Sequence, residues 1–79
     1  MFPRLTRKPP EITAGASYSR PRRDNVVEIA KVIAIRPDAA GIPHVRFNLH
    51  IESGIRVLDE ERTLSLSRFS ECFRERVTA

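Results

Sequence analysis

The stretch HVRFNLHI, residues 44–51, places apolar and polar side chains on alternate positions. Its apolar members are Val45, Phe47, Leu49 and Ile51, and its polar members are His44, Arg46, Asn48 and His50. Side chains of a β-strand point to opposite faces with a period of two, so this pattern predicts a half-buried antiparallel strand. One face contributes to a core, and the other meets solvent or a partner.

The chain has 79 residues, which is enough for one small domain. A chain of this size buries only about 60% of its unfolded surface, so every apolar strand face is needed for the core. Cys72 is the single cysteine, and therefore no intrachain disulfide can compensate for a small core. This cysteine usage favours a reducing compartment, and we expect a cytoplasmic protein.

The sequence contains no apolar run near the ~18 residues of a membrane helix, and no apolar segment typical of a secretory signal near its start. We therefore expect no membrane association. Residues 1–23 are basic with Glu11 as their one acid, which leaves an organelle transit peptide as an alternative. Four prolines in this segment oppose the amphipathic helix that such a peptide needs.

The positive charge of the chain is concentrated near its start. Residues 1–24 carry six basic residues and two acids, a net charge of +4, whereas residues 25–79 are neutral overall. The basic residues are Arg4, Arg7, Lys8, Arg20, Arg22 and Arg23. Four prolines and the absence of periodicity predict that residues 1–24 form an extended or disordered arm. This arm is either a solvated tail or a segment that contacts phosphates or a partner protein.

The remaining residues, 25–79, show a succession of short strand patterns. The expected strands span residues 25–36, 44–51, 55–58 and 63–66. The expected connections are a loop at 37–43, a tight turn at 52–54 and a charged turn at 59–62. Strands joined in this order by short connections form an antiparallel meander.

The last dozen residues change from a strand period to a helical period. One interpretation is a helix over 67–77 with Ser67 as its N-cap. The other is a helical turn over 69–73 followed by a last short strand. Both place Phe69 and Phe73 in the core. The predicted fold is mainly β: a small meander of four or five strands that resembles the SH3-like barrels, with a short helix near the C-terminus.

The outward row His44, Arg46, Asn48 and His50 is the clearest candidate surface of the folded part. Arginine binds carboxylate or phosphate through two parallel hydrogen bonds, and Asn or His can hydrogen-bond a base edge or a partner backbone. We expect Arg56 to share this face across the turn at 52–54. The alternative is the ordinary solvent side of an antiparallel strand.

Metal binding and catalysis receive little support from the sequence. His44 and His50 are six residues apart on one strand, about 20 Å, so they cannot bind the same zinc ion. Cys72 shares the predicted apolar face of Phe69 and Phe73, where a buried thiol is inert. We expect no metal, no cofactor and no enzymatic activity.

Two binding functions remain. In the first, the chain is an accessory subunit or modulator that docks on a larger protein assembly through its arm and through an edge strand or strand face. In the second, it is a nucleic-acid-associated protein that uses the basic arm for phosphate contacts. The neutral folded part favours the protein partner. The oligomeric state and the identity of the partner do not follow from the sequence.

Overall fold

A computed structural model describes residues 11–20 and 24–77 of the chain. Its elements are β1 Ser17–Ser19, β2 Val26–Pro37, β3 Pro43–Ser53, β4 Arg56–Ser65, α1 Leu66–Cys72 and β5 Glu75–Val77. The described strands form one five-stranded antiparallel sheet in the order β4-β3-β2-β1-β5. The prediction of a mainly β fold with a short helix near the C-terminus is confirmed.

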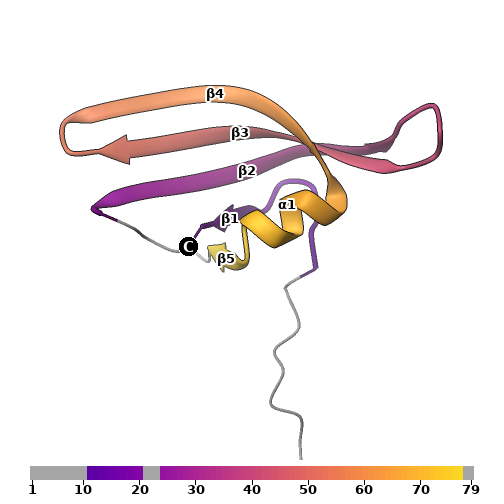
Figure 1. The fold of residues 1–79 in the computed structure, drawn as a ribbon, viewed down its shortest axis with the longest axis horizontal. Coiled ribbons are helices and arrows are strands. Elements are labelled where there is room, and N and C mark those ends of the chain that lie inside the picture. Colours follow the sequence, from indigo (N-terminus) through magenta and orange to yellow (C-terminus); the bar gives the residue numbers. More distant parts are fainter. Residues whose placement is uncertain (1–10, 21–23, 78–79) are drawn as a thin grey trace, which may run out of the picture.

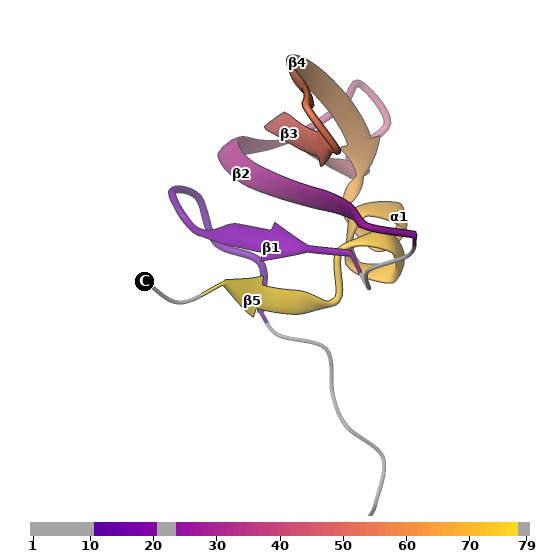
Figure 2. The same cartoon turned by 90° about the vertical axis from the view of Figure 1, so that its left-hand side faces the viewer.

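The three long strands β2, β3 and β4 lie side by side as successive hairpins, and the short strands β1 and β5 lie below them with α1 (Figure 1). The view turned by 90° shows the sheet curving from β4 to β5, with α1 on one side of it (Figure 2). Strands β4 and β5 end the sheet, and no pairing between them joins the described residues into a ring. The sheet is therefore open, and the predicted closed barrel is not confirmed.

The core lies between the sheet and α1, and Phe69 of α1 is at its centre. The Phe69 ring centroid lies 5.0 Å from that of Phe47, 4.9 Å from that of Phe73 and 5.7 Å from that of Tyr18. Aromatic pairs in such contacts add about 0.5–1.5 kcal/mol each beyond the burial of their area. The buried residues are Tyr18, Ala30, Val32, Val45, Phe47, Leu49, Phe69 and Phe73. The predicted core positions Phe47, Phe69 and Phe73 are thus confirmed.

Strand β2 contains a β-bulge, which accounts for part of the apolar pattern seen on both of its faces in the sequence. Val32 lies opposite Phe47, but Ala34 lies opposite Arg46, so the register shifts by one residue at Ile33. A bulge exchanges the inward and outward positions of the residues that follow it. As a result Val32 and Ile35, which have opposite parity, both pack with the core, and Ile33 is 42% exposed.

Strand β1 lies within residues 1–24, so the prediction that this whole segment is an extended or disordered arm is wrong for this part of it. Tyr18 is fully buried opposite Ala30, its hydroxyl donates to the Glu11 carbonyl, and the Thr13 N–H donates to that hydroxyl, each at 2.9 Å. Residues 11–20 therefore belong to the folded unit, and the boundary predicted at residue 24 is too late for them. A strand of three residues is too short to show a period, which is why the sequence pattern missed it. Residues 1–10 and 21–23 lie outside the described residues.

Strands β3 and β4 are joined by a two-residue turn at Gly54 and Ile55, with Ser53 opposite Arg56. Gly54 has a φ of +64°, and glycine is the residue that a type II′ hairpin turn needs at its first position. The turn predicted at 52–54 is therefore one residue too early. The charged turn predicted at 59–62 is wrong, since these residues continue β4 without a break.

The end of the chain follows the second of the two interpretations: α1 stops at Cys72, and β5 pairs with β1. The N-cap is Ser65, whose hydroxyl accepts a hydrogen bond from the Arg68 N–H at 3.2 Å. The prediction that Ser67 caps the helix is wrong by two residues. This shift makes β4 and α1 directly continuous at Ser65.

Candidate functional site

The predicted polar row on β3 exists as a row. His44, Arg46, Asn48 and His50 alternate with the buried residues Val45, Phe47 and Leu49. The register with β4 places Ser65, Thr63, Glu61 and Asp59 opposite these four residues. We call this the outer face of the sheet, and the side that carries Phe47 the inner face.

Carboxylates of β4 contact two members of this row, Arg46 and Asn48. Arg46 Nη1 donates to Glu61 Oε2 at 3.0 Å, and Asn48 Nδ2 lies 3.5 Å from Asp59 Oδ1. Both carboxylates come from β4, in the segment that the sequence analysis assigned to a turn. Arg46 thus already has a carboxylate partner within the chain. Both side chains of this ion pair are about half exposed, as is common on the solvated face of a strand.

His50 lies between two carboxylates. Its Nδ1 is 2.8 Å from Asp59 Oδ1, and its Nε2 is 2.9 Å from Glu52 Oε2. Neutral imidazole has one N–H and satisfies one of these acceptors, whereas imidazolium satisfies both. The hydrogen bond with Glu52, followed by that with Asp59, raises the pKa of His50. The hydrogen bond with His50 in turn lowers the pKa of Asp59.

His44, near the start of β3, contacts the loop between β2 and β3. Its Nδ1 lies 2.9 Å from the Ile42 carbonyl and 3.8 Å from Asp38 Oδ2. Asp38 accepts hydrogen bonds from the Ala40 and Ile42 N–H groups at 2.8 and 2.9 Å. The bond from Ile42 is the main reason why the pKa of Asp38 is lowered. His44 and Asp38 thus stabilise the β2–β3 connection.

The arrangement around His50 does not form a metal site. Asp59 and Glu52 approach opposite nitrogens of the ring, so the three side chains do not converge on one point. Across the described part of the chain, no group of three or more His, Cys, Asp or Glu side chains is arranged to hold a metal ion. Within the same residues, no helix is long and apolar enough to cross a membrane.

Arg56 does not share the outer face. It lies opposite Ser53, which has the same parity as Phe47 and Leu49, and so it lies on the inner face. The prediction fails because the turn is at Gly54 and Ile55 and not at 52–54. Moving a turn by one residue transfers every following side chain to the other face of the strand.

Of the basic residues predicted in the arm, Arg20 is described and is engaged within the fold. Its Nη1 lies 3.6 Å from Glu28 Oε1, and its guanidinium carbon lies 5.8 Å from the centroid of the Phe73 ring. The others, Arg4, Arg7, Lys8, Arg22 and Arg23, lie outside the described residues.

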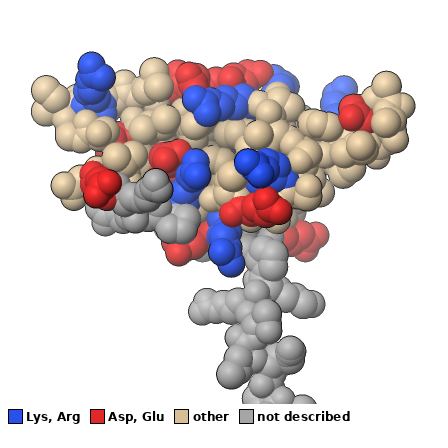
Figure 3. All heavy atoms as spheres, viewed as in Figure 1, with Lys and Arg blue, Asp and Glu red and all other residues tan. Residues whose placement is uncertain are grey.

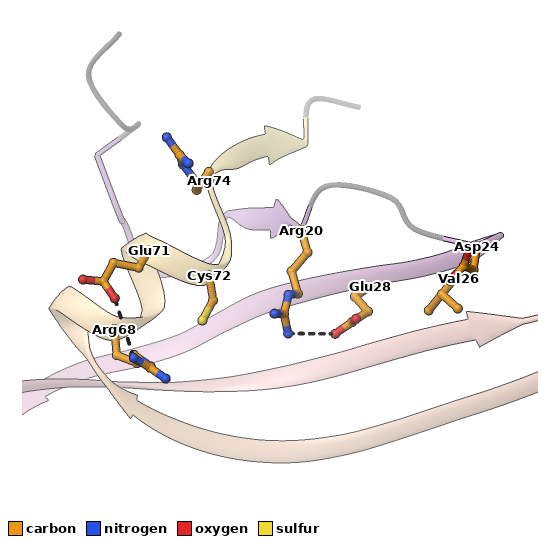
Figure 4. Close-up of a pocket in the computed structure, with 8 residues that line it drawn as sticks. All are labelled: Arg20, Asp24, Val26, Glu28, Arg68, Glu71, Cys72 and Arg74. Atoms are coloured by element: carbon orange, nitrogen blue, oxygen red, sulfur yellow. Dashed lines mark ion pairs between the residues drawn. The ribbon is translucent and has the colours of Figure 1, made fainter. Parts of the chain in front are cut away.

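Beside Arg20 a hollow of about 740 Å³ opens between the first half of β2 and α1 (Figure 4). Arg20 pairs with Glu28, and Arg68 lies 3.8 Å from Glu71, while Cys72 points between the two arginines. Acids and bases are equal in number around the hollow, so it has no charge excess for an anion or a cation. Its lining residues are Arg20, Asp24, Val26, Glu28, Arg68, Glu71, Cys72 and Arg74.

The charges of the described surface are mixed in the same way. Lys and Arg alternate with Asp and Glu across the view of Figure 3, and neither sign forms a continuous patch there. All described aromatic rings, those of Tyr18, Phe47, Phe69 and Phe73, are buried. Binding of single-stranded nucleic acid by base stacking would require exposed rings, which this part of the chain does not provide.

The free edge of β4 is a feature that the sequence analysis did not locate, although it expected docking through an edge strand. β4 has ten residues, and no described strand pairs with it on the side away from β3. Near it are three exposed apolar side chains: Ile55 at 100%, Val57 at 60% and Leu58 at 50% exposure. The signal was present in the sequence, because residues 59–62 contain no Gly or Pro to end a strand.

Comparison of the chain with protein-family models, curated proteins and solved structures finds no match in any of the three.

Proposed function

We propose that this protein is a non-enzymatic binding module that docks on a larger protein assembly by adding a strand of its partner to the edge of β4. The observation that carries this proposal is the length of that edge: ten residues in β4 against three in β5. The exposed backbone N–H and C=O groups of an edge strand are a template for pairing with another chain.

The two edges differ in the way expected of a docking edge and a protected edge. Proteins usually blunt free edges by making them short, as β5 is. β4 is long, the exposed apolar residues Val57 and Leu58 lie at its beginning, and the exposed Ile55 lies in the turn just before it. Such apolar side chains supply hydrophobic contact beside a strand pair, so the beginning of β4 has both components of a docking surface.

We also infer that the sheet is an open form of the SH3-like small barrel. Three hairpin-connected long strands, a helical turn between β4 and β5, and the pairing of β5 with β1 support this assignment. Because fold class does not imply function, the docking proposal depends on the β4 edge and not on this likeness.

A pair of matched substitutions tests the docking proposal. Leu58→Lys places a charge on the β4 edge, and Val77→Lys places the same charge on the β5 edge, where Val77 is 39% exposed. We expect a tagged full-length chain to capture a stoichiometric partner from its own cells, Leu58→Lys to lose it and Val77→Lys to keep it. Equal capture by both variants, or no capture by the unmodified chain, would contradict the proposal.

Nucleic-acid binding is the second candidate, and the net charge of +4 on residues 1–24 is the observation that favours it. Replacing Arg4, Arg7 and Lys8 by Gln removes three charges, which should reduce the slope of log affinity against log salt by about 2.7 if each contacts a phosphate. The control replaces Arg56, Arg68 and Arg74 by Gln and should leave the slope unchanged. Absence of duplex binding at low salt would reject this candidate.

A further inference from the structure

We propose that the strand which pairs with the β4 edge is β4 of a second copy of this chain, in an antiparallel dimer whose two-fold axis passes at Glu61. This inference rests on the strand pairing of the proposed function, and it names a second copy of this chain, in place of another protein, as the partner at the β4 edge. It follows from the distribution of charged and apolar residues along β4.

The register is selected by the inner face of β4. This face carries Arg56, Leu58, Glu60, Arg62 and Leu64. When two copies meet about an axis at Glu61, Glu60 lies opposite Arg62 of the second copy, and Leu58 lies opposite Leu64 of the second copy. Two-fold symmetry repeats both contacts. Opposite charges and apolar pairs directly across an antiparallel pair are stabilising.

Neighbouring registers lose this complementarity. With the axis at Glu60, that residue faces its own copy, and Asp59 faces Glu61 of the second copy. With the axis at Arg62, two arginines face each other and Glu60 faces Leu64. Like charges directly opposite are destabilising, so the register centred on Glu61 is preferred to these two neighbours. A register centred on Leu58 would place Arg56 opposite Glu60 of the second copy, and the substitution Arg56→Glu distinguishes it from the one centred on Glu61.

The outer face tolerates this register. Its like-charged contact is the one between the two Glu61 residues at the axis, and each Glu61 already accepts a hydrogen bond from Arg46 at 3.0 Å within its own chain. Asp59 meets Thr63 of the second copy, and Val57 meets Ser65. The charge of the axial pair is therefore offset by two arginines.

Charge exchange between copies tests the register with the full-length chain. Glu60→Arg or Arg62→Glu alone places two like-charged pairs across the interface, and sedimentation should show a dissociation constant raised by roughly tenfold or more. A mixture of the two single variants restores both opposite-charge pairs, so it should form heterodimers of the original affinity. The control Arg56→Glu lies outside the paired residues 57–65 and should leave the affinity unchanged.

This mixing experiment separates contacts between copies from contacts within one chain. Glu60 and Arg62 form an ion pair within the monomer as well. In the mixture each monomer still has its own pair broken, so recovery of the dimer can arise only from contacts between copies. Failure of the mixture to recover a dimer that each single substitution dissociates would overturn the register.

Cross-linking locates the axis. In a Cys72→Ser background, Glu61→Cys brings two thiols together across an antiparallel pair, where Cα atoms lie about 4.5–5.5 Å apart and a disulfide can form. Thr63→Cys leaves its two thiols about 13 Å apart along the strands, so it should not cross-link. Cross-linking of Thr63→Cys alone would overturn the axis position.

The outcomes distinguish this inference from the proposed function. A chain that is monomeric at all concentrations, but whose capture of another protein is lost in Leu58→Lys, overturns the dimer and leaves strand docking intact. A dimer that is unaffected by Leu58→Lys and by both charge reversals contradicts the use of the β4 edge altogether.

Discussion

The two faces of β3 differ in what their contacts contribute to the protein. On the inner face Val45, Phe47 and Leu49 are at most 2% exposed and pack around Phe69. On the outer face Arg46 and His50 are paired with carboxylates in solvent. Burial contributes about 1.5–3 kcal/mol for each large apolar side chain, whereas an exposed ion pair contributes about 0–1 kcal/mol. The inner face therefore provides most of the stability of the fold, and substitutions on the outer face should change stability little.

The largest expected effect is at the centre of the inner face. Phe69→Ala removes the ring that contacts Phe47, Phe73 and Tyr18, and we expect it to lower the free energy of unfolding by about 3–5 kcal/mol. A protein of this size is stable by only about 4–12 kcal/mol, so much of its stability is lost. Urea unfolding measures the change.

The matched control for Phe69→Ala is Val57→Ala, an apolar truncation on the outer face at 60% exposure. Its unfolding free energy should stay within about 0.5 kcal/mol of the unmodified chain. Similar losses for the two substitutions would show that the core is not where the structure places it.

The junction between β4 and α1 gives an intermediate effect. Ser65→Ala removes the hydroxyl that accepts from the Arg68 N–H, and we expect a loss of about 1 kcal/mol in the free energy of unfolding. Ser67→Ala, two residues further along the chain, removes the same hydroxyl from an exposed helical position and should cost less than about 0.5 kcal/mol. The opposite ranking would place the helix start at Ser67, as the sequence pattern suggested.

The ion pair of the outer face should give a smaller effect. A double-mutant cycle with Arg46→Ala and Glu61→Ala isolates the coupling between these two half-exposed side chains, for which we expect about 0.2–1 kcal/mol. High salt should reduce it further. A coupling above about 2 kcal/mol would mean that the outer face contributes to stability on the scale of the core.

The titration of His50 should have the smallest effect on stability. We expect NMR to detect this titration more readily than unfolding measurements do. Because the folded pKa of His50 is raised, its contribution is fully present below the unfolded value of about 6.5 and is lost as the pH rises through the folded pKa. Asp59, whose pKa is lowered, contributes above its unfolded value and loses this contribution as the pH falls through its folded pKa. The contribution of the pair to stability is therefore full between the unfolded pKa of Asp59, about 3.9, and the unfolded pKa of His50, about 6.5.

The imidazole resonances of His50 should titrate above pH 6.5, and Asp59→Asn should lower the midpoint by removing one of the two carboxylates. A His50 midpoint below 6.5 in the unmodified chain would contradict the placement of this ring between Glu52 and Asp59.

Some of these features follow from sequence because they depend on neighbouring residues alone. The alternation over residues 44–51 defines both faces of β3, and the spacing of Phe69 and Phe73 places both rings on one side of a helical turn. The periods of strand and helix are local properties of the backbone, so a single segment is sufficient to show them.

Other features arise only when distant segments meet. Tyr18 enters the core through a strand of three residues between β2 and β5, and the bulge at Ile33 brings Ile35 to the side of Val32. The continuity of β4 through residues 59–62 depends on pairing with β3 and decides which face carries Arg56 and where a free edge remains. Register and edge exposure are properties of strand pairs, and a pattern within one strand does not contain them. The sequence by itself thus determined which residues alternate, and the tertiary structure alone decided what each of them faces.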